Sequence, residues 1–449
     1  MASVMWFRRD LRLGDNPALL EAAADGPVLP LFVLDAALWG PAGPSRRGYL
    51  GASLRALDAE LLERGGRLGV VRGDPVRRVV RAAKAVGAQR VHAAADFGPY
   101  GRGRDRAVAQ ALADAGIELV LTGSPYAVAP GRVTNGSGDP YQVFTPFSRA
   151  WSDHGWRDPA DEPNDAGWLT LEKDTTTIPE TRLPAGLELP DAGEAAARRR
   201  WAEFLERVDA YDDDRDKPGV DGTSHMSVHL KWGEIHPRTM LADLARKRSA
   251  GAASYRTELA WREFYADVLF AQPRTARDYL RTEYAAMAYD RPGAQLEAWR
   301  AGRTGFPIVD AGMRQLRATG WMHNRVRMVV ASFLVKDLHL EWQHGARHFM
   351  HWLVDGDLAS NQHGWQWVAG CGTDAAPYFR VFNPTGQGRK FDPDGGYVRR
   401  WVGELSDPGL VPDPHDPDPD TRELVGYPQP VVDHRAERQE ALDRWERIR

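Results

Sequence analysis

Val4-Met-Trp-Phe-Arg-Arg-Asp-Leu-Arg-Leu-Gly-Asp-Asn-Pro17 opens the chain with an apolar run, and a second run, Val28-Leu-Pro-Leu-Phe-Val-Leu-Asp35, follows one helix length later. Three further short runs continue this pattern, at Leu68–Arg72, Arg90–Ala94 and Ile117–Leu121. Amphipathic stretches separate them near 46–64, 75–87 and 101–115. Such alternation predicts an α/β fold, a doubly wound, Rossmann-like parallel sheet with helices on both faces. Ligands of such sheets bind at the carboxyl ends of the strands.

The pattern changes twice after the last of these runs. Residues 125–195 are rich in Pro, Gly, Asp and Thr, which predicts a long connector draped over the surface. From about 196 onward the periodicity is helical. We therefore predict three segments: an α/β domain over 1–128, a connector over 129–195 and a larger all-α domain over 196–449. Helices are expected at 196–210, 238–250, 255–271, 307–318, 322–340, 345–354 and 433–448, with a Pro/Asp loop at 406–420.

Composition narrows the class of protein. The 449 residues are 43% hydrophobic and 27% charged, as in a globular protein. No run of about 18 apolar residues predicts a membrane span, and the first residues lack a signal peptide's apolar stretch. Cys371 is the single cysteine, so neither an internal disulfide nor a cysteine zinc site is expected, and a cytoplasmic location fits. The net charge is −4, but residues 297–350 are locally basic, which suggests a nucleic-acid-binding face.

Two stretches combine electron-rich and polar residues, Gly320-Trp-Met-His-Asn-Arg-Val-Arg-Met328 and Asp355-Gly-Asp-Leu-Ala-Ser-Asn-Gln-His-Gly-Trp-Gln-Trp367. Trp is oxidised easily, and Trp clusters beside acids and amides suggest electron transfer around a bound redox cofactor. Glu258, Trp261, Arg262 and Tyr265 share one helical face, because they stand at i, i+3, i+4 and i+7. That face is either a surface with an ion pair or the lining of a cavity for a planar polar ligand.

Three smaller motifs leave alternatives open. Asn324, Arg327 and Met328 repeat the same geometry, although Met at such a position is often plain core. Gly222-Thr-Ser-His-Met-Ser227 could hold a phosphate or simply cap a helix. His344, His348 and His351 stand at i, i+4 and i+7; without HExxH or a cysteine partner we expect packing and hydrogen bonds and no metal.

The chain resembles the photolyase/cryptochrome family along nearly its whole length. The opening stretch resembles that family's first strand and loop. Long ordered motifs continue the resemblance, at Thr145-Pro-Phe147, Gly302-Arg-Thr-Gly-Phe-Pro-Ile-Val-Asp-Ala311, the Trp321 segment, Phe382-Asn-Pro-Thr-Gly-Gln-Gly-Arg-Lys-Phe-Asp392 and Tyr427-Pro-Gln-Pro-Val-Val-Asp-His434. The resemblance is greatest to class I cyclobutane pyrimidine dimer photolyases.

The resemblance implies FAD, active in its reduced form, in the helical domain. Arg327 is expected to pair with Asp355 by the isoalloxazine ring, and Asn361 to face flavin N5, as in repair enzymes. Trp365 and Trp342 occupy the proximal and middle positions of the family's electron chain, but the distal position reads Tyr289. The implied FAD contacts are Tyr211, Thr223, Ser224, His225, Met226, Ser227, Arg262, Arg327, Asp355, Gly356, Asp357 and Asn361.

The same resemblance implies a DNA substrate. Trp261 and Trp367 are expected to sandwich a flipped pyrimidine dimer, and Glu258 and Asn324 to bind its polar edges. Met328 lines this pocket, whereas Arg215, Arg325 and Gln387 match DNA-contacting positions. Gln362-His363 departs from the Asn-Gly of many relatives.

An antenna pigment is expected in the α/β domain. Ala276 and Arg277 stand where some relatives bind methenyltetrahydrofolate, which favours a deazaflavin, with Arg47, Asp96 and Tyr100 as contacts. The leading hypothesis is thus light-driven dimer repair by a monomer acting on damaged DNA, without a membrane. The alternatives are a cryptochrome-like blue-light photoreceptor, a (6-4) photolyase and, more remotely, another flavoprotein oxidoreductase.

Overall fold

A computed structural model describes residues 1–163, 166–374 and 379–449. Contacts divide the chain into two compact units that interleave along the sequence. Unit 1 comprises 1–184, 189–209 and 224–273, and unit 2 comprises 185–188, 210–223 and 274–449. The predicted three-segment division follows the sequence instead and stays a prediction. Each unit is described by itself.

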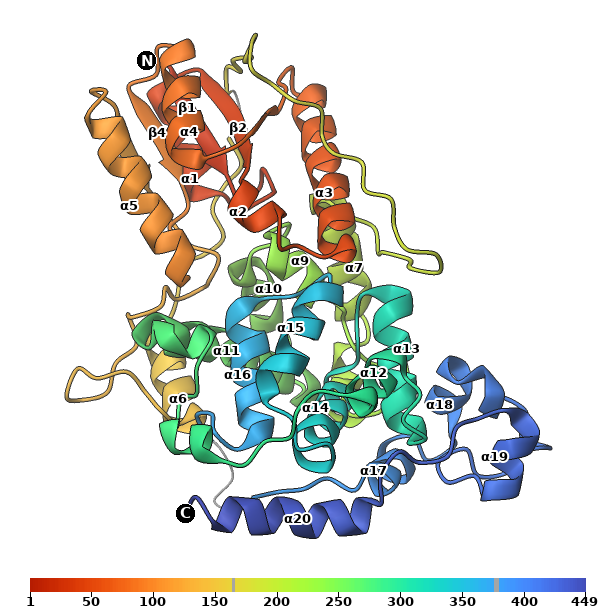
Figure 1. The fold of residues 1–449 in the computed structure, drawn as a ribbon. Coiled ribbons are helices and arrows are strands. Elements are labelled where there is room, and N and C mark those ends of the chain that lie inside the picture. Colours follow the sequence, from red (N-terminus) through yellow and green to blue (C-terminus); the bar gives the residue numbers. More distant parts are fainter. Residues whose placement is uncertain (164–165, 375–378) are drawn as a thin grey trace. The chain divides into compact units, whose positions relative to one another are not determined.

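Unit 1 contains the predicted parallel sheet (Figure 1). All five strands pair in parallel, in the order β3-β2-β1-β4-β5. Each lies within two residues of its predicted bounds. The strands are β1 (Ser3–Phe7), β2 (Val28–Leu34), β3 (Gly69–Arg72), β4 (Arg90–Ala93) and β5 (Glu118–Leu121). The α/β prediction is therefore confirmed.

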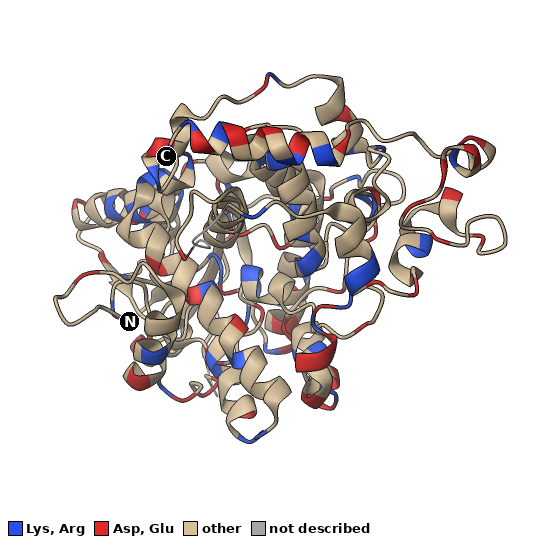
Figure 2. Cartoon of the chain, turned by 90° about the horizontal axis from the view of Figure 1, so that it is seen from below, with Lys and Arg blue, Asp and Glu red and all other residues tan. Residues whose placement is uncertain are grey.

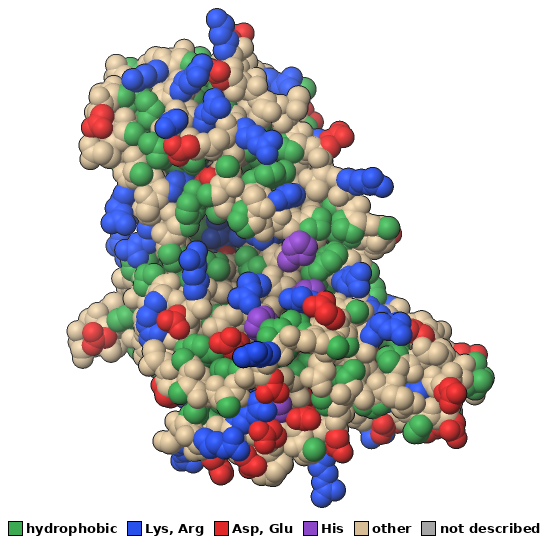
Figure 3. Space-filling view, viewed as in Figure 1, with side chains coloured by type: hydrophobic (Ala, Val, Ile, Leu, Met, Phe, Trp, Pro, Cys, Tyr) green, Lys and Arg blue, Asp and Glu red, His purple; other side chains and the backbone are tan. Residues whose placement is uncertain are grey.

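Alternation along β1 explains the two layers of helices. Met5 and Phe7 pack in one cluster with residues of α1 (Pro17–Asp25) and α3 (Pro44–Glu63). Val4 and Trp6 pack in the other with residues of α4 (Pro75–Ala85) and α5 (Pro99–Ala113). Successive side chains of a strand point to opposite faces, so one strand supplies both layers. The outward sides of α4 and α5 carry exposed Lys and Arg (Figure 3). The short α2 (Ala36–Trp39) follows β2.

The predicted surface connector is partly wrong. Residues 144–154 form a helix, α6, whose Phe144, Phe147 and Trp151 are buried. These aromatic residues recur at i, i+3 and i+7, so they form the apolar face of a helix that the Pro and Gly around it concealed. The remaining helices of unit 1 are α7 (Glu194–Leu205), α9 (Ser227–Trp232), α10 (Pro237–Ala245) and α11 (Ala250–Ala271).

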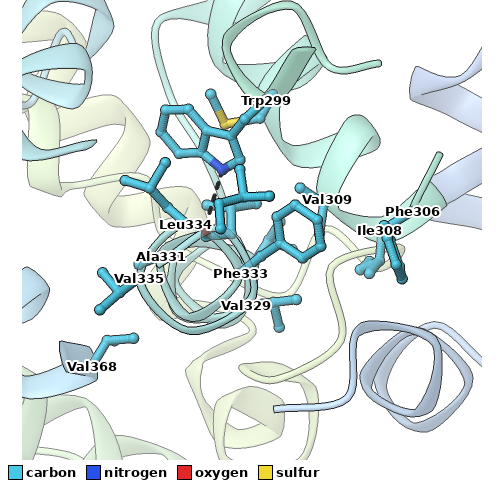
Figure 4. Packing of buried hydrophobic residues seen from close by; sticks show 14 of the residues in the cluster. Trp299, Phe306, Ile308, Val309, Val329, Ala331, Phe333, Leu334, Val335 and Val368 are labelled. Atoms are coloured by element: carbon cyan, nitrogen blue, oxygen red, sulfur yellow. Dashed lines mark hydrogen bonds between the residues drawn. The ribbon is translucent and has the colours of Figure 1, made fainter. Parts of the chain in front are cut away.

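Unit 2 is helical and has one large core. Trp299 lies in this core, and its indole N–H donates to the main-chain oxygen of Val330 at 3.0 Å (Figure 4). The predicted 322–340 helix is an α-helix, α14 (Asn324–Ser332), that continues as a π-helix, η4 (Phe333–Asp337). The other helices are α8 (Tyr211–Asp214), α12 (Ala294–Ala301), α13 (Pro307–Thr319), α15 (Trp342–Trp352), α16 (Leu358–Ala369), α17 (Pro384–Phe391), α18 (Gly396–Trp401), α19 (Pro419–Val425) and α20 (His434–Glu446).

The last helix is bound to this core by charge as well as by packing. Acidic and basic residues intersperse along α20 (Figure 2). His434 contacts Asp337 of η4, and Glu437 contacts His339 at 2.7 Å. Single-turn 3₁₀ segments complete the two units: η1 (Val208–Ala210), η2 (Pro273–Ala276), η3 (Thr282–Ala286) and η5 (Gly403–Leu405). Within the described residues, no helix has both the length and the apolar character to cross a membrane.

Candidate functional site

The predicted Arg327–Asp355 pair is present in unit 2. A terminal nitrogen of Arg327 lies 2.8 Å from Oδ2 of Asp355, and its Nε donates to the main-chain oxygen of Met322. The carboxylate is buried, but a quarter of the Arg327 side chain is exposed. Within the part of the chain that the structure describes, the buried Oδ1 of Asp355 has no hydrogen-bond partner. A buried carboxylate oxygen without a donor is costly. A bound polar ligand with an N–H group would satisfy it, which fits a flavin.

Gly356 and Asp357 lead from this pair into α16, which the sequence periodicity missed. Asp357 is the N-cap, and its side chain accepts from the main-chain N–H of Ser360 at 3.1 Å. The helix ends at Gly370 in the left-handed region. An Asp cap and a terminal glycine were readable signals, although the polar run of Asn361, Gln362 and His363 obscured the apolar face. The cap fixes where Asn361, Trp365 and Trp367 lie.

Asn361 is buried, and its amide is already engaged. Its Nδ2 donates to the main-chain oxygen of Ala346 at 3.2 Å and to Oε1 of Gln362 at 2.7 Å. The amide hydrogens therefore stabilise the protein itself. Any hydrogen bond from a flavin N–H would be accepted by the side-chain oxygen.

The departure from the family pattern at Gln362-His363 has a structural role. Gln362 donates to the main-chain oxygen of Ala276 at 2.6 Å, and Nε2 of His363 lies 3.0 Å from the Thr275 hydroxyl. Gln366 donates to the Thr275 main-chain oxygen and accepts from the N–H of Leu280. These three side chains hold residues 275–280, and we call them the amide latch. Burial lowers the pKa of His363 to about 4, so this imidazole is neutral at neutral pH.

Trp365 and Trp342 form the core of the predicted electron chain. Both are buried, and within the described residues neither indole N–H has a hydrogen-bond partner. A β-carbon on Gly345 would lie 2.0 Å from the Trp365 ring, so the glycine lets this indole lie against α15. Tyr289 is half-buried, and its hydroxyl donates to the main-chain oxygen of Tyr284. A ring that sequence reasoning missed, Tyr279, has its centroid 6.2 Å from Trp342 and 6.3 Å from Tyr289.

The hydroxyl-rich loop of unit 1 is held in a defined conformation. The Ser224 hydroxyl lies 2.7 Å from that of Tyr255 and accepts from the N–H of Met226. Arg200 donates to the main-chain oxygen of Ser224. His225 has φ +56°, which is uncommon for a residue other than glycine. Ser227 is exposed at the start of α9.

Trp261 presents a supported aromatic surface in unit 1. Phe144 of α6 stacks on it with centroids 3.7 Å apart and planes within 7°. Trp261 is half-buried, as is Glu258 one turn earlier on α11. Arg262 donates to the main-chain oxygens of Pro125 and Leu230, so its guanidinium joins parts of unit 1.

The substrate-side residues of unit 2 lie on several helices. Asn324 is exposed and Met328 half-buried on α14, Gln387 lies on α17, and the Trp367 indole N–H donates to the main-chain oxygen of Asp374.

Two predicted FAD contacts, Tyr211 and Thr223, lie in the segment 210–223 of unit 2. Tyr211 is buried, with the guanidinium of Arg215, a predicted DNA contact, 5.5 Å from its ring centroid. Thr223 is half-buried at the end of the same segment.

The basic stretch 297–350 is less positive in the structure than in the sequence. Arg325 pairs with Asp216 at 2.7 Å, and Arg314 pairs with Glu404. Lys336 is buried, which lowers its pKa to about 7. Acids from outside the stretch therefore neutralise part of it, whereas Arg303, Arg317 and Arg347 stay exposed.

The histidines with metal-like spacing are engaged otherwise. Nδ1 of His344 lies 3.0 Å from a guanidinium nitrogen of Arg347. His348 meets the Trp299 ring edge-on at 5.3 Å, and burial lowers its pKa to about 3. These contacts agree with the expectation of packing and hydrogen bonding.

The three predicted antenna contacts lie in unit 1. Tyr100 donates to Asp35, which follows β2, and Asp96, after β4, accepts from Arg104 at 3.1 Å. Arg47 on α3 donates to the main-chain oxygens of Trp39 and Gly40. Asp35 and Asp96 thus stand at the carboxyl ends of two strands, where such sheets bind ligands.

Comparisons with known proteins agree with this geometry. Sequence profiles match at residues 3–164 (DNA photolyase) and 255–447 (FAD binding domain of DNA photolyase). A deoxyribodipyrimidine photo-lyase of Streptomyces griseus is 40% identical over 472 residues, covering 100% of this chain and 99% of that relative. A class III photolyase structure from Agrobacterium tumefaciens has TM-score 0.90 at 36% identity, covering 100% of this chain and 97% of the other. An archaeal photolyase structure from Sulfolobus tokodaii with two FAD molecules has TM-score 0.85 at 30% identity, covering 100% of both chains.

The parallel α/β sheet of unit 1 and the helical unit 2, with its buried Asp355 carboxylate, have the architecture of the photolyase structures compared above. The chain belongs to the DNA photolyase family, and its second half belongs to that family's FAD-binding domain.

Proposed function

We propose that this protein repairs cyclobutane pyrimidine dimers in DNA with light. Bound reduced FAD, when excited, supplies the electron that opens the cyclobutane ring and then takes it back. The observation that carries the proposal is the pairing, along α16, of a buried Trp365 with a half-buried Trp367 anchored to Asp374. The buried indole of Trp365 suits electron transfer inside the protein, and the half-buried indole of Trp367 suits contact with a ligand.

The roles of the chain's residues follow from their contacts. Asp355 holds a polar edge of the flavin through Oδ1, which has no other hydrogen-bond partner among the residues that the structure describes, and Arg327 compensates its charge. Trp365 and Trp342 carry electrons when the flavin must be photoreduced. Trp367 and Trp261 hold the dimer by stacking, while Glu258 and Asn324 bind its polar edges. The remaining FAD contacts are those that the resemblance implies, with the Thr223–Ser227 loop at the phosphates.

A second chromophore is proposed for the α/β unit. Asp35 and Asp96 stand at strand ends, Tyr100 donates to Asp35, and Arg47 donates to the main-chain oxygen of Trp39. Ala276 contributes its main-chain oxygen to the amide latch, which gives that position a structural use. The residue types Ala276 and Arg277, at positions where some relatives bind methenyltetrahydrofolate, favour a deazaflavin. Extraction and chromatography of pigments from the purified protein distinguish these groups.

A repair assay tests the main proposal. Irradiated oligothymidylate containing cyclobutane dimers is incubated with the reduced holoenzyme in blue light and in darkness. We expect dimers to disappear only in light. A parallel substrate with one (6-4) lesion should persist. Persistence of both lesions, with the flavin photochemically active, would instead favour the cryptochrome-like photoreceptor.

A further inference from the structure

Tyr279 contacts both Trp342 and Tyr289, the middle and distal members of the predicted electron chain. Its ring meets Trp342 edge-on, with centroids 6.2 Å apart and planes at 90°. The Tyr279 ring also stacks with Tyr289, with centroids 6.3 Å apart and planes at 23°. Tyr279 is only 3% exposed. The Tyr279 ring therefore offers a hole on Trp342 a direct aromatic neighbour.

The two tyrosines differ in what accepts their hydrogen bonds. The Tyr279 hydroxyl donates to the carboxylate Oε1 of Glu341 at 3.2 Å. The Tyr289 hydroxyl donates to the main-chain oxygen of Tyr284 at 3.3 Å. A carboxylate can take a proton from its partner, whereas an amide carbonyl oxygen is a far weaker base. Glu341 is only half-buried, so a proton it receives can pass to water.

Proton acceptance decides which phenol can be oxidised. Burial raises the pKa of both Tyr279 and Tyr289 above the usual value, so neither is ionised at neutral pH. An oxidised phenol that kept its proton would be a cation in an apolar site, which is costly. Oxidation must therefore be coupled to loss of the proton, and of the two tyrosines Tyr279 has the basic partner.

We propose that Tyr279, with Glu341 as its proton acceptor, is the electron donor to Trp342. When FAD is bound, its photoexcited oxidised form would be the one-electron oxidant of Trp365, and the resulting hole would move to Trp342. One electron then passes from Tyr279 to Trp342. The phenolic O–H bond breaks, and its proton goes to the Glu341 carboxylate. The products are neutral Trp342, a neutral Tyr279 radical and protonated Glu341. A small thiol in solution returns one electron and one proton to the radical.

This inference rests on the proposed function, because it needs FAD and the Trp365–Trp342 chain. It adds a residue that touches that chain and moves the exit from Tyr289 to Tyr279. Glu341 needs no movement for its part, because it immediately precedes Trp342 as the N-cap residue of α15.

The experiment is flash excitation of the holoenzyme with oxidised flavin, followed by transient absorption and electron paramagnetic resonance. In the parent protein we expect decay of the tryptophan radical together with the appearance of a neutral tyrosyl radical. Ring-deuterated tyrosine should change the hyperfine pattern of that signal. Exchange into D₂O should slow its formation, because a proton moves with the electron.

Four variants assign the radical. Tyr279→Phe should abolish the tyrosyl signal and prolong the tryptophan radical. Tyr289→Phe and Tyr284→Phe are the matched controls, since each removes a hydroxyl from the same tyrosine cluster, and both should keep the signal. Glu341→Gln keeps every ring but should slow radical formation and remove the D₂O effect. Flavin content and near-UV circular dichroism report whether each variant folds.

The outcomes separate this inference from the proposed function. A tyrosyl radical that survives in Tyr279→Phe, or that vanishes only in Tyr289→Phe, overturns the Tyr279 assignment while the tryptophan chain stands. A signal indifferent to Glu341→Gln overturns the proton acceptor. If Trp365→Phe leaves the tryptophan and tyrosine radicals unchanged, the electron chain of the proposed function itself fails. If Tyr279→Phe misfolds, Glu341→Gln and the deuterated parent protein still decide.

Discussion

Helices α11 and α16 each carry a half-buried tryptophan and hold an irregular segment, but the side chains that hold the segment differ in charge. Each carries a half-buried tryptophan predicted to hold the dimer, Trp261 on α11 and Trp367 on α16. Each also holds an irregular segment of its own unit by buried polar side chains. In α16 these are the neutral groups of the amide latch. In α11 they are carboxylates: Glu263 accepts from the N–H groups of Ala127 and Val128, and Asp267 accepts from that of Gly131.

The difference follows from what each segment offers. Residues 127–131 present only N–H donors to α11, so acceptor-only carboxylates suit them. Residues 275–280 present both carbonyl oxygens and an N–H, which amides can pair with. Burial raises the pKa of Glu263 and Asp267 but lowers that of His363. The contribution of the carboxylates is therefore lost as pH rises through their folded pKa, and that of His363 is lost as pH falls below its unfolded value.

Removing the central carboxylate of α11 should have the largest effect. Glu263→Ala leaves three donors without partners, namely the N–H groups of Ala127 and Val128 and the Trp151 indole N–H. At about 1–3 kcal/mol for each buried donor, we expect a loss of about 4 kcal/mol in the free energy of unfolding, measured with urea. Glu263→Gln keeps one acceptor oxygen and should cost clearly less. Equal losses in the two variants would contradict this account.

Acid should weaken the amide latch through His363. Its pKa is about 4 when folded and about 6.5 when unfolded, so the unfolded chain binds the extra proton between these values. Stability should fall by about 1.4 kcal/mol per pH unit over this window, roughly 3 kcal/mol in all. His236 is also buried with a lowered pKa, so the measurement is the difference between the parent protein and His363→Gln. Parallel pH curves for the two proteins would rule out the assignment.

Trp261 and Trp367 should each strengthen binding to dimer-containing DNA. Stacking contributes about 1–3 kcal/mol per base, so Trp367→Ala should weaken binding to irradiated duplex roughly 5- to 150-fold. Trp261→Ala should act similarly, and the flavin spectrum should change little in either variant. Trp352→Ala is the control, since this half-buried tryptophan has no proposed role. An unchanged preference for damaged over intact DNA in both variants would remove the tryptophans from the substrate site.

The smallest expected effect concerns Gln362. Gln362→Leu removes the bonds to the Ala276 oxygen and to the Asn361 amide. We expect a loss of about 1–2 kcal/mol in the free energy of unfolding. The second measurement is the vibronic structure of bound flavin absorbance, because Asn361 would keep its bond to the Ala346 oxygen but lose the one to Gln362. A spectrum identical to that of the parent protein would show that the amide latch does not influence the surroundings of the flavin.

Much of the fold was readable from the sequence because its signals are local. The five strands follow from short apolar runs, and the capped helices from their periodicity. The α6 helix was missed because Pro and Gly surround it, and α16 was missed because polar residues that contact other segments interrupt its apolar face. The amide latch and Tyr279 were missed for a related reason. Their partners, Thr275 and Trp342, stand tens of residues away, and spacing in a single sequence cannot reveal such contacts.

In the candidate site, the sequence predicted one side-chain pair correctly but did not predict the partners of other site residues. The Arg327–Asp355 pair is confirmed as a contact. Arg325 and Arg262, by contrast, proved to be engaged with Asp216 and with main-chain oxygens. Motif resemblance finds a position, but charge and hydrogen-bond partners depend on what the fold brings beside it.

Gly345 has a consequence for how related sequences diverge. Any side chain there would collide with the Trp365 ring, yet the residue has no chemistry of its own. A change at this glycine would thus displace an electron carrier while every aromatic residue of the chain stays in the sequence. A protein that lost photoreduction in this way would still contain every aromatic residue of the electron chain in its sequence. Photoreduction therefore depends on a glycine at position 345 as much as on the aromatic rings.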